Sequence, residues 1–220
     1  MSRIDILADR SGPLTRAAVL TDGRLSDLYI DHAGRPSLLG AVFLGRVERI
    51  ATGLNAAFVD LGVDPGGGTS GLLGASDARG AKGRVERIGT LLRTGQPVLV
   101  QVKADAVAAK GPTLTMDVTL PGRFLVHAPL ARGVAVSKRL GTGPARAELI
   151  RRLDSVLVGE GWIARAGAAT ATPDQLTAEA DSLRLAWRAV ADAAQGPAPA
   201  LLRAGPDAPM RALIEHGAAA

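Results

Sequence analysis

The chain has 220 residues, of which 47% are hydrophobic, 21% are charged and 3% are aromatic, and its formal net charge is +5. Its length allows one large domain or two small ones, and the absence of cysteine excludes disulfides, thiolate zinc sites and thiol nucleophiles. No apolar run approaches about 18 residues and the N-terminus has no signal pattern, so we expect a cytoplasmic protein that does not associate with a membrane.

The basic groups are unevenly distributed along the chain. Residues 121–152 carry seven basic side chains and only one acidic side chain, Glu148. Two interpretations of this segment stay open: a solvated face of the protein, or a surface that contacts phosphate. The positive net charge favours an anionic partner in general.

The first 37 residues predict three short strands, Arg3–Ala8, Arg16–Leu20 and Arg24–Ile30, followed by a linker at Asp31–Ser37. An Asp-Gly dipeptide at residues 22–23 separates the second strand from the third. This dipeptide is typical of β-hairpin turns. We therefore expect an antiparallel hairpin in the N-terminal segment.

The next stretch predicts a meander of short apolar strands. Glycine-rich or polar segments separate the strands, which is the pattern of a small β-barrel. The strands are expected at Ala41–Ile50, Asn55–Leu61, Gly71–Leu73, Pro97–Lys103 and Thr113–Leu120.

Two of the three phenylalanines, Phe43 and Phe58, lie in the first two of these strands. Side chains alternate between the two faces of a strand, so one of the rings can lie on the outer surface. OB-folds use such exposed rings, flanked by arginines, to stack single-stranded bases. The alternative is that both rings lie in the core, where phenylalanine is most often found.

The remaining residues predict a mixture of strands and helices. Thr172 is the expected N-cap of the longest helix, and Trp187 is expected in the core. Ala200–Arg203 is a candidate strand of the N-terminal sheet. Other strands are expected at Phe124–Val126, Gly133–Val136 and Trp162–Arg165, and helices at Pro144–Leu157, Pro173–Ala194 and Asp207–Glu215.

The three histidines, His32, His127 and His216, are scattered along the chain. None of them has the spacing of a Ser/His/Asp triad or of a metal site, so each is expected to be a surface or hydrogen-bonded histidine. The chain offers no aspartate pair in an apolar strand that would hold a divalent cation. We therefore expect no catalytic residue and no metal ligand in this chain.

Several segments together resemble the ribonuclease E/G family. LNAAFVDLG (residues 54–62) and KGPTLTMDVTLPGRFLV (residues 110–126) are the most specific of them. The resemblance covers nearly the whole chain, in order and with similar spacings. The other segments are GAVFLGRVERI (residues 40–50), GVAVSKRL (133–140), GWIARAG (161–167) and PAPALLRAGPDAPMRALIEH (197–216).

The resemblance implies an α+β fold, in which an OB-fold β-barrel is inserted into a split RNase H-like α/β piece. A mixed 5′-sensor subdomain with one long helix follows the barrel. The implied domains are residues 1–36 and 196–220 for the two RNase H-like segments, 37–119 for the barrel and 120–195 for the 5′-sensor region. The RNase H-like fold is inactive in the family, so its acids Asp5, Asp22 and Asp27 are expected to be structural.

For the barrel, the resemblance implies an RNA-binding face. One of the family's two RNA-stacking aromatic positions falls on Phe58, and the second falls on Leu72. The family's basic RNA contact falls on Lys110, which is retained. Because one aromatic ring is replaced by leucine, we expect single-stranded RNA to bind more weakly than at a complete platform.

For the region after the barrel, the resemblance implies a pocket for the 5′-monophosphate of RNA. The family's pocket arginine falls on Arg165, and its other pocket positions fall on Gly122, Val126 and Lys138. The neighbouring threonine of the family is Ala166 here, so one hydroxyl donor is lost. The alternative is that Arg165 only ends a strand and forms an ion pair.

Three hypotheses about function follow. In the first, the chain binds single-stranded RNA, which can carry a 5′-monophosphate, as the substrate-recognition part of a ribonuclease E/G protein in RNA processing and degradation. In the second, it is a Mg²⁺-dependent endoribonuclease completed by a partner chain, because the family's metal-binding aspartates lie in a deoxyribonuclease-I-like domain that has no counterpart here. In the third, it is a structural or interaction module. No cofactor is expected in this chain, and a homo-oligomer or a catalytic partner chain fits the first two hypotheses.

Overall fold

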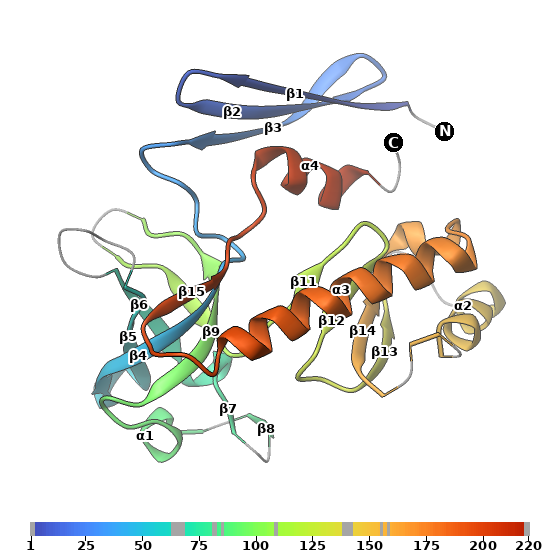
Figure 1. The fold of residues 1–220 in the computed structure, drawn as a ribbon. Coiled ribbons are helices and arrows are strands. Elements are labelled where there is room, and N and C mark those ends of the chain that lie inside the picture. The colour runs from blue at the N-terminus through green and yellow to red at the C-terminus, as the bar shows by residue number, and fades with distance from the viewer. Residues whose placement is uncertain are drawn as a thin grey trace. The chain divides into compact units, whose positions relative to one another are not determined.

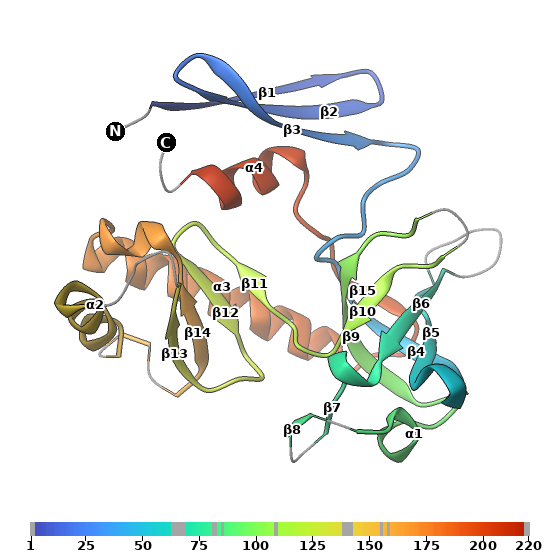
Figure 2. The same cartoon turned by 180° about the vertical axis from the view of Figure 1, so that it is seen from behind.

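The computed structural model describes residues 3–62, 69–80, 83–84, 86–107, 110–137, 143–154, 156–157 and 159–217. It confirms a mixed α+β fold with several sheets and one long helix (Figures 1 and 2). Two compact units are present. The first consists of Met1–Ser37, Thr119–Trp187 and Pro206–Ala220, and the second of Leu38–Val118 and Arg188–Gly205.

The second unit contains the predicted β-barrel. Its five strands follow one another in the order β4-β5-β6-β10-β9, and β9 pairs with β4 to close the barrel. This closed five-stranded arrangement is that of an OB-like barrel. The strands are β4 (Val42–Ala51), β5 (Ala56–Asp60), β6 (Ser70–Gly74), β9 (Pro97–Ala104) and β10 (Thr113–Thr115).

Short elements join the barrel strands. The 3₁₀ helix η1 (Thr52–Leu54) makes the β4–β5 turn, and η2 (Ala75–Asp77) follows β6. The small hairpin of β7 (Arg79–Gly80) and β8 (Gly83–Arg84) precedes a single helical turn, α1 (Ile88–Leu91). The segments η1 and α1 border a cavity.

Strand alternation decides which phenylalanine enters the barrel core. Phe43 is fully buried, together with Val59, Leu73 and Leu114. Phe58 is half-buried, and its neighbours Ala57 and Val59 point into the core from the same strand. Side chains of successive residues alternate, so Phe58 lies on the outer face. The prediction of one outward ring is confirmed, and the alternative that both rings are core is wrong.

The strand expected at Ala200–Arg203 exists as β15, but it pairs antiparallel with β4 of the barrel. The expectation that it joins the N-terminal sheet is therefore wrong. The reason is an unfilled edge: β5 pairs with residues 46–51 of β4 and leaves residues 42–44 without a partner on that side. Arg46 strengthens the junction, since its guanidinium donates to the carbonyl of Ala198 at 2.6 Å.

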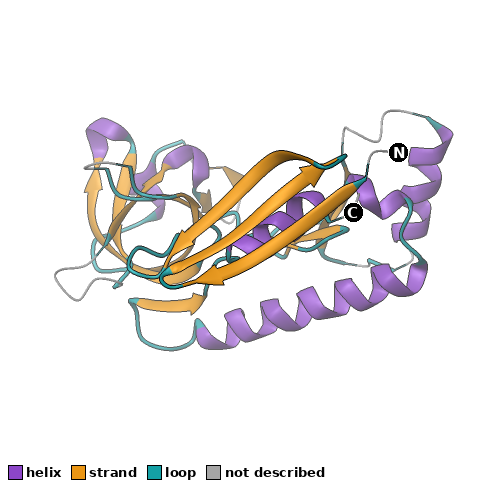
Figure 3. Ribbon diagram, turned by 90° about the horizontal axis from the view of Figure 1, so that it is seen from above, coloured by secondary structure: helices purple, strands orange, loops and turns teal. Residues whose placement is uncertain are grey.

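In the first unit, the N-terminal strands are longer than predicted and form one antiparallel sheet (Figure 3). They are β1 (Ile4–Ser11), β2 (Leu14–Thr21) and β3 (Arg24–His32), so Asp31 belongs to a strand and the linker predicted to begin there starts later. Helix α4 (Ala208–His216) covers one face, where Ala17, Val19 and Ala212 are buried. Asp31 bonds to Arg211 at 2.8 Å and to the backbone amide of Ala208 at 2.6 Å.

The rest of the first unit is a four-stranded sheet with helices. Its strands run in the order β11-β12-β14-β13. Thr172 caps the long helix α3 as predicted. Its hydroxyl accepts a hydrogen bond from the backbone amide of Gln175 at 3.2 Å, and its own backbone amide donates to the side-chain oxygen of Gln175. Trp187 packs against the apolar core, as predicted. The elements are β11 (Leu120–Pro121), β12 (Leu125–Ala128), β13 (Gly133–Val136), α2 (Pro144–Asp154), β14 (Gly161–Ala164), η4 (Ala166–Ala169) and α3 (Pro173–Ala193), of which α3 continues into the second unit from Arg188 on.

Candidate nucleic-acid interface

A row of four side chains crosses the outer face of the barrel. Strand pairing sets Arg49 of β4 opposite Phe58 of β5, Phe58 opposite Leu72 of β6, and Leu72 opposite Thr113 of β10. Directly paired residues point to the same face of a sheet. Two of the positions predicted to bind RNA, Phe58 and Leu72, are therefore neighbours.

Arg49 was not among the predicted RNA-binding residues, and it adds a positive charge to this row. Its guanidinium carbon lies 3.8 Å from the centroid of the Phe58 ring. A planar guanidinium can stack on an aromatic ring and on a nucleobase. The row thus presents a stacked arginine and phenylalanine, flanked by the apolar side chain of Leu72. The sequence placed Arg49 in a strand but gave no sign of its partner. A bulge in β4 between Val47 and Arg49 shifts the register, and this shift brings Arg49 opposite Phe58.

Lys110 is exposed and lies on the segment that leads into β10. Its backbone exchanges two hydrogen bonds of 3.0 Å with Val107, and the amide of Leu72 donates to Pro112 at 2.8 Å. A side chain at Gly111 would collide with the carbonyl oxygen of Ser70, so glycine permits this close approach. The chain at Lys110 therefore passes directly beside the strand that carries Leu72.

The second group of predicted residues surrounds the loop between β11 and β12. Gly122 begins this loop, and Val126 pairs with Pro121 on one side and with Ile163 of β14 on the other. Lys138, the fourth predicted pocket residue, lies outside the described residues. No contact between these positions and a phosphate-sized ligand follows from their placement alone.

A carboxylate from α3 already occupies this loop. The amides of Arg123, Phe124 and Leu125 donate to the carboxylate of Glu179 at 2.6, 2.8 and 2.7 Å. A β-carbon at Gly122 would lie 2.6 Å from the same carboxyl group. Three consecutive backbone donors of this kind form an anion-binding nest, and here the anion belongs to the protein. Sequence reasoning missed Glu179 because its partners are backbone groups more than 50 residues away.

Arg165 follows β14 and is largely buried. Its amide donates to the carbonyl of Phe124 at 2.8 Å, and its guanidinium lies 3.3 Å from the carboxylate of Glu215 on α4. Ala166 begins η4, and the hydroxyl of Thr170 donates to the carbonyl of Gly167 at 3.1 Å. The arginine is thus held beside the loop by an acidic partner.

His127 forms a buried aromatic stack that the sequence did not indicate. The side chain is fully buried and its ring stacks on Trp162 at 4.2 Å. Burial lowers the pKa of His127, and the carboxylate of Glu160, 3.5 Å from Nε2, opposes this shift. The surface position expected for this histidine is wrong, because the ring is fully buried, and neither ring nitrogen has a hydrogen-bond partner in the described part of the chain.

The acidic residues of the N-terminal sheet are dispersed rather than clustered. Asp5 pairs with Arg3 at 2.9 Å, Asp22 accepts from the Arg3 amide at 2.8 Å, and Asp27 lies 3.7 Å from His216. In the part of the chain that the structure describes, no three histidine, aspartate or glutamate side chains could together hold a metal ion. Within the same ranges, no helix has the length and apolar character needed to cross a membrane.

Comparison with known proteins agrees with the motifs and the barrel. The ribonuclease E/G family model matches residues 119–219. Ribonuclease G of Escherichia coli K12 is 32% identical over 205 residues, which cover 88% of this chain and 41% of that protein. Ribonuclease E of a Nostoc species is 34% identical over 203 residues, covering 90% of this chain and 28% of that protein.

The chain belongs to the ribonuclease E/G family. A ribonuclease E/G-like protein of Porphyra purpurea is also similar, with 33% identity over 126 residues, which cover 56% of this chain and 24% of that protein. The chain spans about two fifths (41%) of the length of the Ribonuclease G relatives that it matches. In this member of the ribonuclease E/G family, the barrel row and the Gly122–Leu125 loop are the two places where the predicted site residues gather.

Proposed function

We propose that this chain binds single-stranded RNA on the outer face of its barrel, as the substrate-recognition part of a ribonuclease E/G family protein in cytoplasmic RNA processing and mRNA decay. The observation that carries this proposal is the Arg49–Phe58–Leu72 row. Bases of any sequence can stack on an aromatic ring or a guanidinium plane, and each stacked base contributes roughly 1–3 kcal/mol.

Charge supports the same assignment. Arg49 and Lys110 are exposed, and neither forms an ion pair with a side chain in the described ranges. A backbone phosphate that approaches either cation releases counterions, which makes the affinity fall with salt. A purely solvated basic surface would lack the adjoining aromatic ring.

We also propose that the β11–β12 loop and Arg165 receive the 5′-monophosphate of the RNA. The finding in support is the largely buried guanidinium of Arg165, whose backbone amide bonds to the loop at Phe124. The amides of Phe124 and Leu125 are taken by Glu179, so the guanidinium is the group proposed to bind the phosphate. A phosphate that binds Arg165 competes with Glu215 for it, and Ala166 provides no hydroxyl. The preference for 5′-monophosphate over 5′-hydroxyl RNA is therefore modest. We assign Mg²⁺ binding and phosphodiester cleavage to a catalytic domain separate from the barrel and the Arg165 pocket, which a partner chain can supply.

The test is a titration with two readouts. A fluorescent A/U-rich single-stranded RNA with a 5′-monophosphate is mixed with the purified chain, with and without Mg²⁺. Anisotropy reports binding, and a denaturing gel of the same samples reports cleavage. Salt-sensitive binding of intact RNA that weakens in Phe58→Ala, but not in the control Arg24→Ala, supports the proposal. Mg²⁺-dependent cleavage by the purified chain would contradict the recognition role proposed for it.

A further inference from the structure

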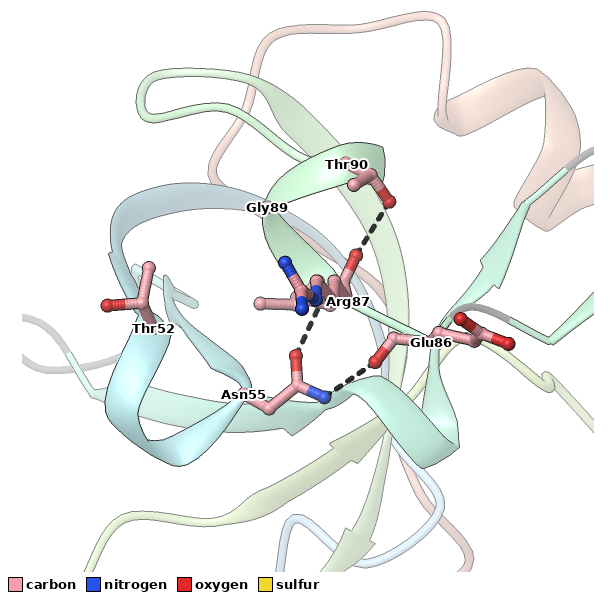
Figure 4. A pocket seen from close by; sticks show the side chains of 7 residues that line it. Thr52, Asn55, Glu86, Arg87, Gly89 and Thr90 are labelled. Atoms are coloured by element: carbon pink, nitrogen blue, oxygen red, sulfur yellow. Dashed lines mark hydrogen bonds between the residues drawn. The ribbon is translucent and has the colours of Figure 1, made fainter.

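A cavity opens at the end of the barrel hairpin that carries the stacking row (Figure 4). Its volume is about 490 Å³, and it is lined by Thr52 of η1, Asn55, and residues 86–90 at the start of α1. This volume lies within the range of small-molecule sites in proteins, roughly 300–1,000 Å³. None of the residues that line it was among the predicted RNA-binding positions.

Asn55 holds the cavity in shape. Its backbone adopts the left-handed conformation with φ of 49°, which asparagine tolerates better than most residues. Its side-chain amide donates to the carbonyl of Glu86 at 2.7 Å and accepts from the amide of Ile88 at 3.0 Å, as Figure 4 shows. Its own carbonyl accepts from Ala75 at 2.9 Å. One residue thus ties the β4–β5 turn to the α1 segment, so the cavity exists before any ligand binds.

The lining groups suit a nucleotide. Arg87 is exposed and forms no ion pair with any side chain in the described ranges, so its guanidinium can receive a phosphate. The hydroxyl of Thr52, which belongs to the lining, can bond to a ribose hydroxyl or to an exocyclic amino group of a base. Gly89 has no side chain and is exposed, which leaves room for a flat ring against its backbone.

The cavity lies at the closed end of the hairpin that carries the stacking row, next to Ile50, whose side chain packs against the barrel core. Thr52 lies three residues after Arg49 on β4, and Asn55 lies three residues before Phe58 on β5. At about 3.3 Å per residue, each wall of the cavity is roughly 10 Å from the row. A single strand that stacks one base at Phe58 and passes around the closed end of the hairpin can therefore bring a nearby nucleotide to the cavity.

We propose that this cavity is a second nucleotide-binding site, which takes a neighbouring nucleotide of the RNA bound at Phe58, with the phosphate at Arg87. The inference rests on the proposed single-stranded RNA binding of the barrel. It adds a residue, Arg87, whose contribution is separate from stacking and from Lys110.

The first experiment measures RNA affinity in Arg87→Met at several salt concentrations by anisotropy. Arg93→Met is the matched control, since Arg93 is also an exposed arginine, follows α1 in the sequence and does not line the cavity. Losing one phosphate contact to a single strand reduces the slope of log K against log salt by about 0.7. We expect this reduction in Arg87→Met and an unchanged slope in Arg93→Met, with the same melting temperature for both variants.

The second experiment titrates the isotope-labelled full chain with adenosine monophosphate, and separately with inorganic phosphate, by NMR. Saturable amide shifts at Thr52, Gly89 and Thr90 with the nucleotide, abolished by Arg87→Met and retained in Phe58→Ala, support the inference. Equal shifts with phosphate alone would overturn the nucleotide assignment.

The two proposals fail separately. If wild-type RNA binding weakens in Phe58→Ala while Arg87→Met behaves like Arg93→Met, the second site is refuted and the barrel function stands. If the wild type binds no RNA but the nucleotide still shifts Gly89 and Thr90, the barrel function fails and the cavity is a nucleotide site of another kind, which refutes the inference as stated.

Discussion

Replacing Glu179 by alanine tests whether the carboxylate in the β11–β12 loop is a major stabilising contact. The change leaves three backbone amides without their acceptor, two of them on the buried residues Phe124 and Leu125. A buried donor that loses its partner costs about 1–3 kcal/mol, while the amide of exposed Arg123 can bond to water instead. We therefore expect Glu179→Ala to lower the free energy of unfolding by about 2–6 kcal/mol.

Urea unfolding followed by tryptophan fluorescence measures this effect, because Trp162 is buried in the core of this unit and Trp187 packs against that core. Glu148→Ala is the control, since Glu148 is an exposed glutamate whose ion pair with Arg151 contributes little. If Glu179→Ala is no more destabilising than this control, the carboxylate is not a structural anchor.

The contact with Gly122 adds an internal check. An alanine side chain there would lie 2.6 Å from the carboxyl group of Glu179 and would push it out of the loop. We expect Gly122→Ala to destabilise by a similar amount to Glu179→Ala, and the double variant to cost little more than either. Full additivity of the two effects would show that the glycine is needed for another reason.

Four further changes test the RNA sites and the buried histidine. Phe58→Ala should weaken single-stranded RNA binding by roughly 1–3 kcal/mol, and Lys110→Ala should weaken it with a smaller salt dependence, both measured by anisotropy. Arg165→Ala should abolish any preference for 5′-monophosphate over 5′-hydroxyl RNA in competition binding. Burial lowers the pKa of His127 below its ordinary 6.5, so below that pH the unfolded chain binds a proton that the folded chain excludes. The free energy of unfolding in urea should keep its full value above about pH 6.5 and decrease as the pH falls below it. In His127→Gln, this free energy should depend less on pH.

Each of these has a contrary result. Unchanged RNA affinity in both barrel variants would remove the outer face from the proposed function. A wild type without 5′-phosphate preference would eliminate the Arg165 pocket without the need for a variant. A His127→Gln protein with the same pH profile as the wild type would show that other groups cause the acid sensitivity.

Local patterns in the sequence determined much of the fold. The alternation of apolar residues set the barrel strands and left Phe58 opposite to the core, because strand side chains alternate whatever the partner strand is. Likewise, Thr172 with Gln175 forms a capping box, which depends only on residues three apart. The motifs of the ribonuclease E/G family are also local runs of residues, so the sequence alone was enough to indicate the family.

Features that depend on distant partners were decided only by the tertiary structure. β15 pairs with β4 because β5 leaves one edge of that strand free, and the length of a neighbouring strand is not written in the sequence of β15. Glu179 binds backbone amides, which carry no residue signature that sequence comparison could detect. The stack of Arg49 on Phe58 and the burial of His127 likewise follow from register and packing. Periodicity predicts the face on which a side chain lies, whereas its partner depends on which elements meet in three dimensions.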